Sequence, residues 1–151
     1  MSLQSLRVYQ TSARVADEVS ALVACWSVFH QDTLGNQIVR AADSISNNIS
    51  EGYGRTSTGE RIQFLMYAEG SAVEVRNCLE RAIKRNLIDE KFAKILIYAL
   101  NGLSIQLVEF ANAILQRDSA YKGPFRARIA RRRAWRSKKE QGNQTLPNSL
   151  S

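Results

Sequence analysis

The sequence has little of several residue types, and each scarcity excludes a class of structure. Only two prolines occur among 151 residues, both in the last fifth of the chain, so nothing before Pro124 forces a helix to break. Only two cysteines occur, and both lie inside helical patterns. In a reducing compartment they are typical of small buried residues and not of a disulfide. No alternating apolar and polar pattern of useful length indicates a strand.

Long uncharged runs are also absent. The longest lie between Glu18 and Asp32 and between Lys94 and Glu109, well short of the roughly 20 residues that a membrane-spanning helix needs. No basic segment followed by an apolar core and a cleavage site opens the sequence. We therefore expect a cytoplasmic protein with no membrane partner.

The sequence offers few residues for catalysis or metal binding. His30 is the only histidine, and Cys25 lies five residues away, a spacing that does not bring two helical side chains to one face. Cys25, Cys78 and His30 lack the clustered spacing of a zinc site, and no Glu-x-x-His pair of a di-iron bundle occurs. We expect a protein that is not an enzyme and that has no catalytic residue, no metal and no cofactor.

Apolar residues recur at helical spacings in four stretches of the chain. Because short polar segments connect these stretches, successive helices are expected to lie antiparallel. The sequence therefore predicts an all-α fold, an antiparallel up-down four-helix bundle. The expected helices span residues 6–29, 34–54, 57–86 and 89–117.

Local signals predict where three of these helices begin. The polar segment HQDT is expected to form a turn before the second helix, with Asp32 or Thr33 as N-cap. Ser57 and Glu60 have the spacing of a capping box at the start of the third helix. Asp89 is the expected N-cap of the fourth.

Other signals predict helix ends and helix faces. Gly52 and Gly54 are expected to end the second helix in the left-handed conformation, and Asn86 to close the third. Gly70 lies inside the third helix, where it is expected to allow a neighbouring helix to approach closely. The apolar positions expected in the fourth helix are Ile95, Tyr98, Leu103, Leu107, Phe110 and Ile114.

The second helix carries small polar side chains opposite its apolar stripe, although serine and asparagine are poor helix formers. One hypothesis is that they let another subunit approach closely, with Arg40, Asn48 and Glu51 as hydrogen-bonding partners. The competing hypothesis is that Asn48 and Arg55 secure the helix-to-turn junction within one chain. The candidate interface consists of Arg40, Ser44, Asn48, Glu51, Gly52 and Arg55.

The formal net charge of +7 is unevenly placed along the chain. Residues 1–118 carry 12 Lys and Arg against 13 Asp and Glu, whereas residues 119–151 carry nine cations against Glu140 alone. We therefore divide the chain into a nearly neutral bundle, 1–118, and an Arg-rich, flexible tail, 119–151. The last ten residues are expected to be disordered, and the arginine-rich part to become helical when it binds a partner.

Two interpretations of the tail remain open. It is either a solubilising appendage or an arm that binds RNA or DNA, with arginines on phosphates and aromatic rings on bases. A membrane surface would also suit cations and aromatics, but the amphipathic pattern is weak. The candidate nucleic-acid-binding residues of the tail are Arg126, Arg128, Arg131, Arg132, Arg133, Trp135, Arg136, Lys138 and Lys139.

A second, weaker basic patch lies on the third helix. It is either a solvated face whose cations complement the helix dipole or a surface that contacts phosphates. The second interpretation gains weight if several subunits repeat the patch around a ring. Its residues are Arg76, Arg81, Lys84 and Arg85.

The run QIVRAADSISNNISEGYGR followed by STGERIQFLMYAEGSAVE resembles the four-helix-bundle family of 23S rRNA intervening-sequence proteins. The resemblance covers about residues 6–115, the whole bundle and not the tail. The family commonly has proline where Ser46 stands, which puts any kink imposed by that proline in doubt. The matching positions are Arg40, Ala41, Ala42, Ser44, Ile45, Asn48, Ile49, Glu51, Gly52, Gly54, Arg55, Ser57, Glu60, Phe64, Leu65, Ala68, Gly70 and Ser71.

The resemblance implies a homo-oligomeric bundle, a ring of five, encoded in some bacteria within insertions in ribosomal RNA genes. The family's biochemical role is poorly defined. The architecture is also similar to that of the accessory proteins of diversity-generating retroelements. Those proteins form basic five-membered barrels that bind nucleic acid and a reverse transcriptase. The motifs themselves do not establish that relation.

Residues and resemblance together predict a non-enzymatic, homo-oligomeric scaffold that binds nucleic acid, RNA in particular, mainly through repeated basic tails. Its affinity is expected to be sequence-tolerant, to fall steeply with salt, and to largely disappear when residues 119–151 are removed. The alternative is a protein-interaction module, such as an accessory protein of a retroelement reverse transcriptase.

Overall fold

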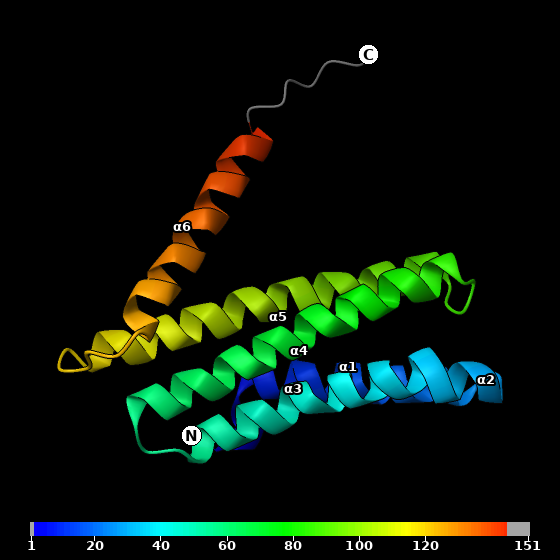
Figure 1. The fold of residues 1–151 in the computed structure, drawn as a ribbon, viewed down its shortest axis with the longest axis horizontal. Helices are drawn as coiled ribbons and strands as arrows, with labels where there is room; N and C mark the ends of the chain where they lie inside the picture. The colour runs from blue at the N-terminus through cyan, green and yellow to red at the C-terminus, as the bar shows by residue number, and fades with distance from the viewer. Residues whose placement is uncertain (1, 145–151) are drawn as a thin grey trace.

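Four long antiparallel helices form the body of the molecule (Figure 1). The structure, a computed structural model, describes residues 2–144. α3 contacts α4, α4 contacts α5, and α1 closes the bundle by contacting both α3 and α5. The predicted all-α four-helix bundle is thereby confirmed. The helices are α1 (Arg7–Ala24), α3 (Asn36–Gly54), α4 (Thr58–Lys84) and α5 (Glu90–Arg117).

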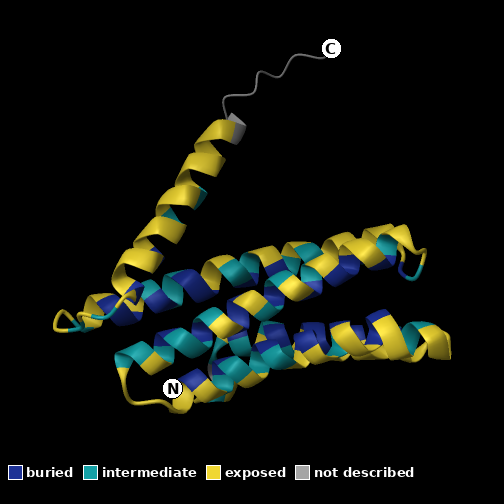
Figure 2. Ribbon diagram, viewed as in Figure 1, coloured by how far each residue is buried: buried dark blue, intermediate teal, exposed yellow. Residues whose placement is uncertain are grey.

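The core is built from one apolar stripe on each of these helices. Val19 of α1, Ile45 of α3, Leu79 of α4 and Leu107 of α5 are fully buried. Buried residues alternate with exposed ones along every helix of the bundle (Figure 2). Burying one side chain of this kind contributes about 1.5–3 kcal/mol, so the four stripes supply most of the force that holds the bundle together.

The predicted boundary between the first two helices is wrong by several residues. α1 ends at Ala24 and does not reach Phe29, and α2 (Val28–His30) begins before the segment HQDT. That segment is not a turn, because His30 ends α2 and the next three residues lie in a π-helical stretch, Gln31–Gly35, that joins α2 directly to α3. Neither of its two candidate caps therefore begins a helix.

Trp26 gives the physical reason for the early end of α1. Its ring is buried, and its indole N–H donates to the Leu87 carbonyl at 2.9 Å, in the connection between α4 and α5. The Gln31 side chain donates to the carbonyls of Val23 and Ala24 at 3.3 and 3.2 Å. The Gln31 side chain thus satisfies carbonyls at the end of α1, and Trp26 ties the residues after α1 to a distant connection, which local periodicity does not reveal.

Gly52 and Gly54 do not end α3 in the predicted left-handed conformation. No glycine within residues 2–144 has a positive φ, and the residue after α3 is extended. Gly52 is instead buried where α3 meets α4, and a Cβ there would lie 3.1 Å from the Cβ of Phe64. The close approach of a neighbouring helix predicted at Gly70 is not found within the chain, since no neighbouring element lies within 4 Å of a Cβ at that position.

The predicted capping positions of α4 and α5 are confirmed. The Ser57 hydroxyl accepts the Glu60 N–H at 3.3 Å and donates to the Glu60 carboxylate at 2.7 Å. The Asp89 carboxylate accepts the Phe92 N–H at 3.1 Å. Asn86 has a φ of 55°, the left-handed conformation that closes a helix.

The apolar stripe predicted for α5 is partly wrong. Ile95 and Tyr98 are 64% and 82% exposed, whereas Leu96 and Leu100 occupy the buried positions beside them. α5 is apolar on more than one side, so periodicity alone does not fix which side faces the core. By length and composition it is the one helix in the described part of the chain that is apolar enough to cross a membrane. Core helices share that property, and nine residues of α5 are buried in the bundle.

The two cysteines differ in environment. Cys78 is buried, as predicted, and burial raises the pKa of its thiol. Cys25 is exposed, so the prediction of a buried position is wrong for this residue. Both thiols are free.

α6 (Phe125–Gln144) extends away from the bundle at the end of α5 (Figure 1). The arginine-rich segment is helical in the chain by itself, so the prediction that it needs a partner to become helical is wrong. The disorder predicted for the last ten residues falls mostly on residues 145–151, which lie outside the described residues.

Candidate nucleic-acid interface

Apolar contacts fix the first turns of α6 to the bundle. Phe125 and Ile129, one helical turn apart, are 7% and 1% exposed and belong to the same core as the bundle helices. Most other residues of α6 are exposed (Figure 2). The helix is therefore anchored where it begins and reaches into solvent where it ends.

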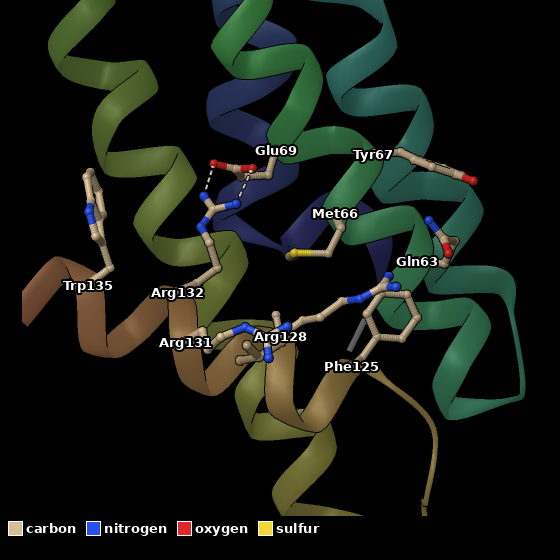
Figure 3. A pocket seen from close by; sticks show the side chains of 10 residues that line it. Gln63, Met66, Tyr67, Glu69, Phe125, Arg128, Arg131, Arg132 and Trp135 are labelled. Carbon is tan, nitrogen blue, oxygen red and sulfur yellow. Dashed lines mark hydrogen bonds and ion pairs between the residues drawn. The ribbon is translucent and has the colours of Figure 1, made fainter.

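An ion pair between α6 and α4 fixes the next turn (Figure 3). The Arg132 guanidinium donates two hydrogen bonds to the Glu69 carboxylate, of which Nη1 to Oε2 measures 3.1 Å. The Glu69 side chain is 8% exposed, whereas that of Arg132 is 48% exposed. Because a buried carboxylate without a partner is costly, Arg132 compensates the charge of Glu69 and is not free for a ligand.

A second carboxylate, on α5, holds two more arginines of α6. The Glu109 Oε1 accepts from Arg133 Nε at 2.9 Å and from Arg136 Nη2 at 2.8 Å. The hydrogen bond from Arg133 lowers the pKa of Glu109 below its ordinary value, and Arg136 adds to the effect while partial burial opposes it. Glu109 thus stays charged at neutral pH and ties α6 to α5.

Arg126 satisfies the end of α5. Its Nη2 donates to the carbonyls of Asp118 at 2.8 Å and Leu115 at 3.3 Å. A cation at this position complements the negative end of the helix dipole. Four of the nine candidates in the tail are therefore engaged with the bundle: Arg126, Arg132, Arg133 and Arg136.

The other five candidates form a separate surface, which we call the outer face of α6. With 100° of rotation per residue, these five side chains fall within an arc of about 100° on the helix. The residues of α6 that contact the bundle lie outside this arc. The Trp135 ring is 64% exposed and has Lys139 Nζ 5.3 Å from its centroid. None of its four cations has an ion-pair or hydrogen-bond partner among residues 2–144, and two of them also make no cation–π contact there. The outer face consists of Arg128, Arg131, Trp135, Lys138 and Lys139, and the two unpartnered cations are Arg131 and Lys138.

Two grooves flank α6. The first, of about 620 Å³, lies between α4 and α6 and is shown in Figure 3. The second, of about 370 Å³, lies between α6 and the pair α4 and α5. Glu69, Arg132 and Trp135 line both grooves, so they mark the boundary between them. The first groove is also lined by Gln63, Met66, Tyr67, Phe125, Arg128, Ile129 and Arg131, and the second by Arg76, Asn101, Ser104, Ile105, Val108, Arg136, Lys139 and Glu140.

The structure divides the predicted basic patch of α4. Arg76 lines the second groove, and its guanidinium donates to the side-chain oxygen of Asn101. Arg81, Lys84 and Arg85 are exposed farther along α4, toward its C-terminal end, and line neither groove. Only Arg76 therefore joins the surface around α6.

The small polar residues of α3 face α4 of the same chain. The Ser44 and Ser71 hydroxyls share a hydrogen bond of 2.9 Å across the two helices. The Asn48 amide donates to the Ser44 hydroxyl at 3.0 Å and to its carbonyl at 2.9 Å. Small side chains at this contact let the two helices pack closely while their polar atoms stay paired.

The remaining interface candidates have mixed surroundings. Arg55 pairs with Glu51 and, at 3.5 Å, with Glu60, and its guanidinium lies 5.0 Å from the Phe64 centroid. These contacts secure the junction between α3 and α4, as the hypothesis of a junction within one chain expects. Arg40 differs, because it is exposed and lines a polar groove near the π-helical stretch, and it has no ion-pair partner among the described residues.

Sequence reasoning missed the carboxylates that hold α6. Glu69 had a usable signal, because it continues the buried stripe of Ile62 and Leu65 seven and four residues later. Glu109 gave no such signal, because it is not among the buried positions of α5 and its partners lie 24 and 27 residues away. Within residues 2–144, no group of three or more His, Cys, Asp or Glu is placed to hold a metal ion.

Comparisons with known proteins identify a family and a fold. The family described as 23S rRNA-intervening sequence protein matches residues 4–109, a range that ends before α6 begins. A crystal structure of a protein with unknown function, from the S23 ribosomal protein family of Bacteroides thetaiotaomicron, is similar with a TM-score of 0.62. Its identity is 22%, covering 69% of this chain and 97% of that chain, which shows a shared fold alone. No curated protein matches the chain.

Proposed function

The chain belongs to the family of 23S rRNA-intervening sequence proteins, and from this premise we propose that it is a non-enzymatic, homo-oligomeric scaffold that binds nucleic acid, RNA in particular, in the cytoplasm. The observation that carries the proposal is the outer face of α6. It holds four cations and one exposed tryptophan on a helix that extends from the bundle.

The charge distribution supports this proposal. The bundle, 1–118, has one more acidic residue than basic residues, so it supplies no general attraction for a polyanion. Glu69 and Glu109 of the bundle form ion pairs with Arg132, Arg133 and Arg136 of α6. No carboxylate of the described residues pairs with a cation of the outer face. Unpaired cations on an exposed helix bind phosphates by displacing condensed counterions, with little dependence on sequence.

Point variants test the proposal better than truncation, because removing α6 would also uncover the surfaces that Phe125 and Ile129 bury. The triple variant Arg128→Ala, Arg131→Ala, Lys138→Ala should bind a labelled single-stranded RNA more weakly. The slope of log affinity against log salt should become shallower by about 2, at about 0.7 for each lost phosphate contact. Fluorescence anisotropy at several salt concentrations measures both quantities.

The matched control replaces three exposed cations away from α6: Arg81→Ala, Lys84→Ala, Arg85→Ala. This variant has the same net charge as the first, so a general effect of charge would weaken both equally. Equal losses, or no binding by the wild type even in dilute buffer, would contradict the proposed role of α6.

A homo-oligomer would repeat the outer face several times on one particle. α5 presents Ile95 and Tyr98 on its exposed side, at 64% and 82% exposure. Exposed apolar stripes of this kind mark protein interfaces. Several weak sites on one assembly would then bind one long polyanion with an avidity above that of a single site.

The second candidate is a protein-interaction module, such as an accessory protein of a reverse transcriptase. The same exposed side of α5 favours it, since a different protein can cover an apolar stripe as well as a second copy can. Purification from the native cell distinguishes the two: bound RNA that depends on α6 supports the first, and a stoichiometric protein partner without RNA supports the second.

A further inference from the structure

We propose that the two grooves beside α6 form one continuous path for a single-stranded polynucleotide, with Trp135 as the base-stacking platform at its centre. This inference rests on the proposed function and adds to it the class of nucleic acid that is bound. Trp135 lines both grooves together with Glu69 and Arg132, so its exposed ring stands where the two grooves meet.

Cations stand on both sides of this platform. Arg128 and Arg131 line the first groove, and Arg76 and Lys139 line the second. Glu140 also lines the second groove, and its carboxylate lies 3.8 Å from Arg136 Nε, which compensates its charge. Arg128 and Lys139 are 11 residues apart on α6, a span of about 16 Å at 1.5 Å per residue. The path therefore offers phosphate contacts before and after the ring, which is the arrangement that single-strand-binding grooves use.

Arg132 lines both grooves at their junction, where its compensated charge attracts phosphate only weakly. Its guanidinium is held by Glu69 in a two-point ion pair, so its charge is already compensated. Figure 3 shows this pair beside the first groove, with Trp135 standing clear of it on α6. The ion pair fixes the position of α6, and with it the position of the Trp135 ring above the path.

Apolar side chains distinguish this path from a purely electrostatic surface. Trp135 is 64% exposed, and Met66 and Tyr67 also line the first groove, although the Tyr67 ring packs edge-on against Phe64 and points away from Trp135 (Figure 3). An acidic peptide or a polyanion without bases would use the cations and leave the Trp135 ring bare. A duplex keeps its bases stacked on one another, so only unpaired bases can cover that ring.

Binding assays with matched probes test the inference on the full-length protein. The probes are a 12-nucleotide oligoadenylate, the duplex of that strand with oligouridylate, oligodeoxyadenylate of equal length, and heparin. Trp135→Ala should lose about 10-fold in affinity for the single strands, the amount that one stacked base contributes. Its affinity for heparin and for the duplex should be unchanged, because those contacts are electrostatic.

Two controls make the result specific. Phe29→Ala removes another aromatic ring, 70% exposed on α2 and distant from the grooves in sequence, and should bind every probe like the wild type. Trp135→Phe retains a smaller ring and should recover part of the single-strand affinity. Circular dichroism verifies that each variant keeps its helices, which is expected because both rings are exposed.

Intrinsic fluorescence gives a second, independent readout. The chain has two tryptophans, and Trp26 is buried with its indole N–H bonded to the Leu87 carbonyl. Oligoadenylate that stacks on Trp135 should quench the exposed part of the emission, and Trp135→Phe should abolish the quenching. Heparin should leave the emission of the wild type unchanged.

The outcomes separate the two proposals. Equal affinity for duplex and single strand, together with no effect of Trp135→Ala, would overturn the stacking path and leave the electrostatic role of α6 intact. Equally tight binding of polyglutamate would overturn it in favour of an acidic peptide ligand. Failure of every polyanion to bind would overturn the proposed function itself.

Discussion

At the scale of single residues, Glu69 and Glu109 determine which cations of α6 are available to a ligand. Glu69 forms an ion pair with Arg132, and Glu109 forms ion pairs with Arg133 and Arg136. Each carboxylate lies on a different bundle helix, so together they also orient α6. The same contacts therefore position the helix and select its outer face as the cationic surface.

The pH dependence of stability should reveal the Glu109 contact. The pKa of Glu109 is lowered in the folded state, so its stabilising effect is fully present above the ordinary glutamate value of about 4.5 and is lost as pH falls through the lowered value. Glu109→Gln should therefore cost about 0.5–1 kcal/mol at pH 7, a modest amount because the pair is partly exposed and screened. Urea denaturation at pH 7 and in acid measures the difference.

In acid the wild type and Glu109→Gln should converge in unfolding free energy, because the protonated carboxyl no longer attracts the two arginines. Lys94→Gln is a suitable control, since its partner Glu90 forms an exposed pair on α5 with no contact to α6. A constant gap between wild type and Glu109→Gln from neutral to acid would contradict the assignment of the pKa shift to α6.

At the scale of helices, two glycines that both lie in helical segments have opposite effects on packing. Gly35 closes the π-helical stretch, where a Cβ would lie 2.7 Å from Val23 Cγ1 and 2.9 Å from the His30 carbonyl oxygen. Gly70 lies in an exposed part of α4 with nothing within 4 Å of a Cβ. Packing explains the first glycine, and nothing within the chain explains the second.

Alanine at these two positions should shift stability in opposite directions. Gly35→Ala should destabilise the protein by about 1–3 kcal/mol, because the backbone oxygen of His30 must move. Gly70→Ala should stabilise it by about 0.5–1 kcal/mol, because alanine favours the helix and meets no obstacle. Urea midpoints at low protein concentration measure both. A destabilised Gly70→Ala variant would show that another subunit packs on that surface.

The four bundle helices and the caps of α4 and α5 follow from local patterns, which explains why they were predictable. Ser57, Asp89 and Asn86 act on backbone groups within a few residues, so their effect is visible in sequence. The early end of α1 was not predictable, because it depends on Trp26 and a carbonyl 61 residues away. The side of α5 that faces the core was ambiguous for a different reason, since both sides are apolar.

The candidate site was predictable only in outline. Composition located the cations in the tail, but their division into inner and outer sets depends on Glu69 and Glu109, which tertiary packing brings to α6. Tyr67 of α4 and Trp135 of α6 line one groove only because the ion pair of Arg132 with Glu69 holds α6 beside α4. Sequence reasoning therefore located the cations but not the carboxylates that engage some of them, and the binding role of the segment stays a prediction.

At the scale of the whole molecule, assembly and binding are assigned to different surfaces. The exposed side of α5 around Ile95 and Tyr98 is apolar, whereas the outer face of α6 is cationic. An assembly formed through the first surface would leave the second free to contact a polyanion. This separation makes the two proposed roles independently testable.

Analytical ultracentrifugation tests the assembly directly. The wild type should sediment at micromolar concentration as a multiple of its 17.0 kDa mass, five-fold if the ring implied by the family resemblance forms. Ile95→Glu combined with Tyr98→Glu should shift the protein toward the monomer, because burying two carboxylates in an apolar interface is costly. Val28→Glu, at a residue 69% exposed on α2, should leave the assembly unchanged.

Assembly should also change binding in a defined way. The dissociated Ile95→Glu, Tyr98→Glu variant retains every cation of the outer face, so it should bind a short oligonucleotide nearly as well as the wild type. Its affinity for a long RNA should fall by a larger factor, since avidity requires several outer faces on one particle. A wild type that sediments as a monomer would reject this account. Dissociation of the Val28→Glu variant would move the subunit contact from α5 to the end of the bundle where α2 begins.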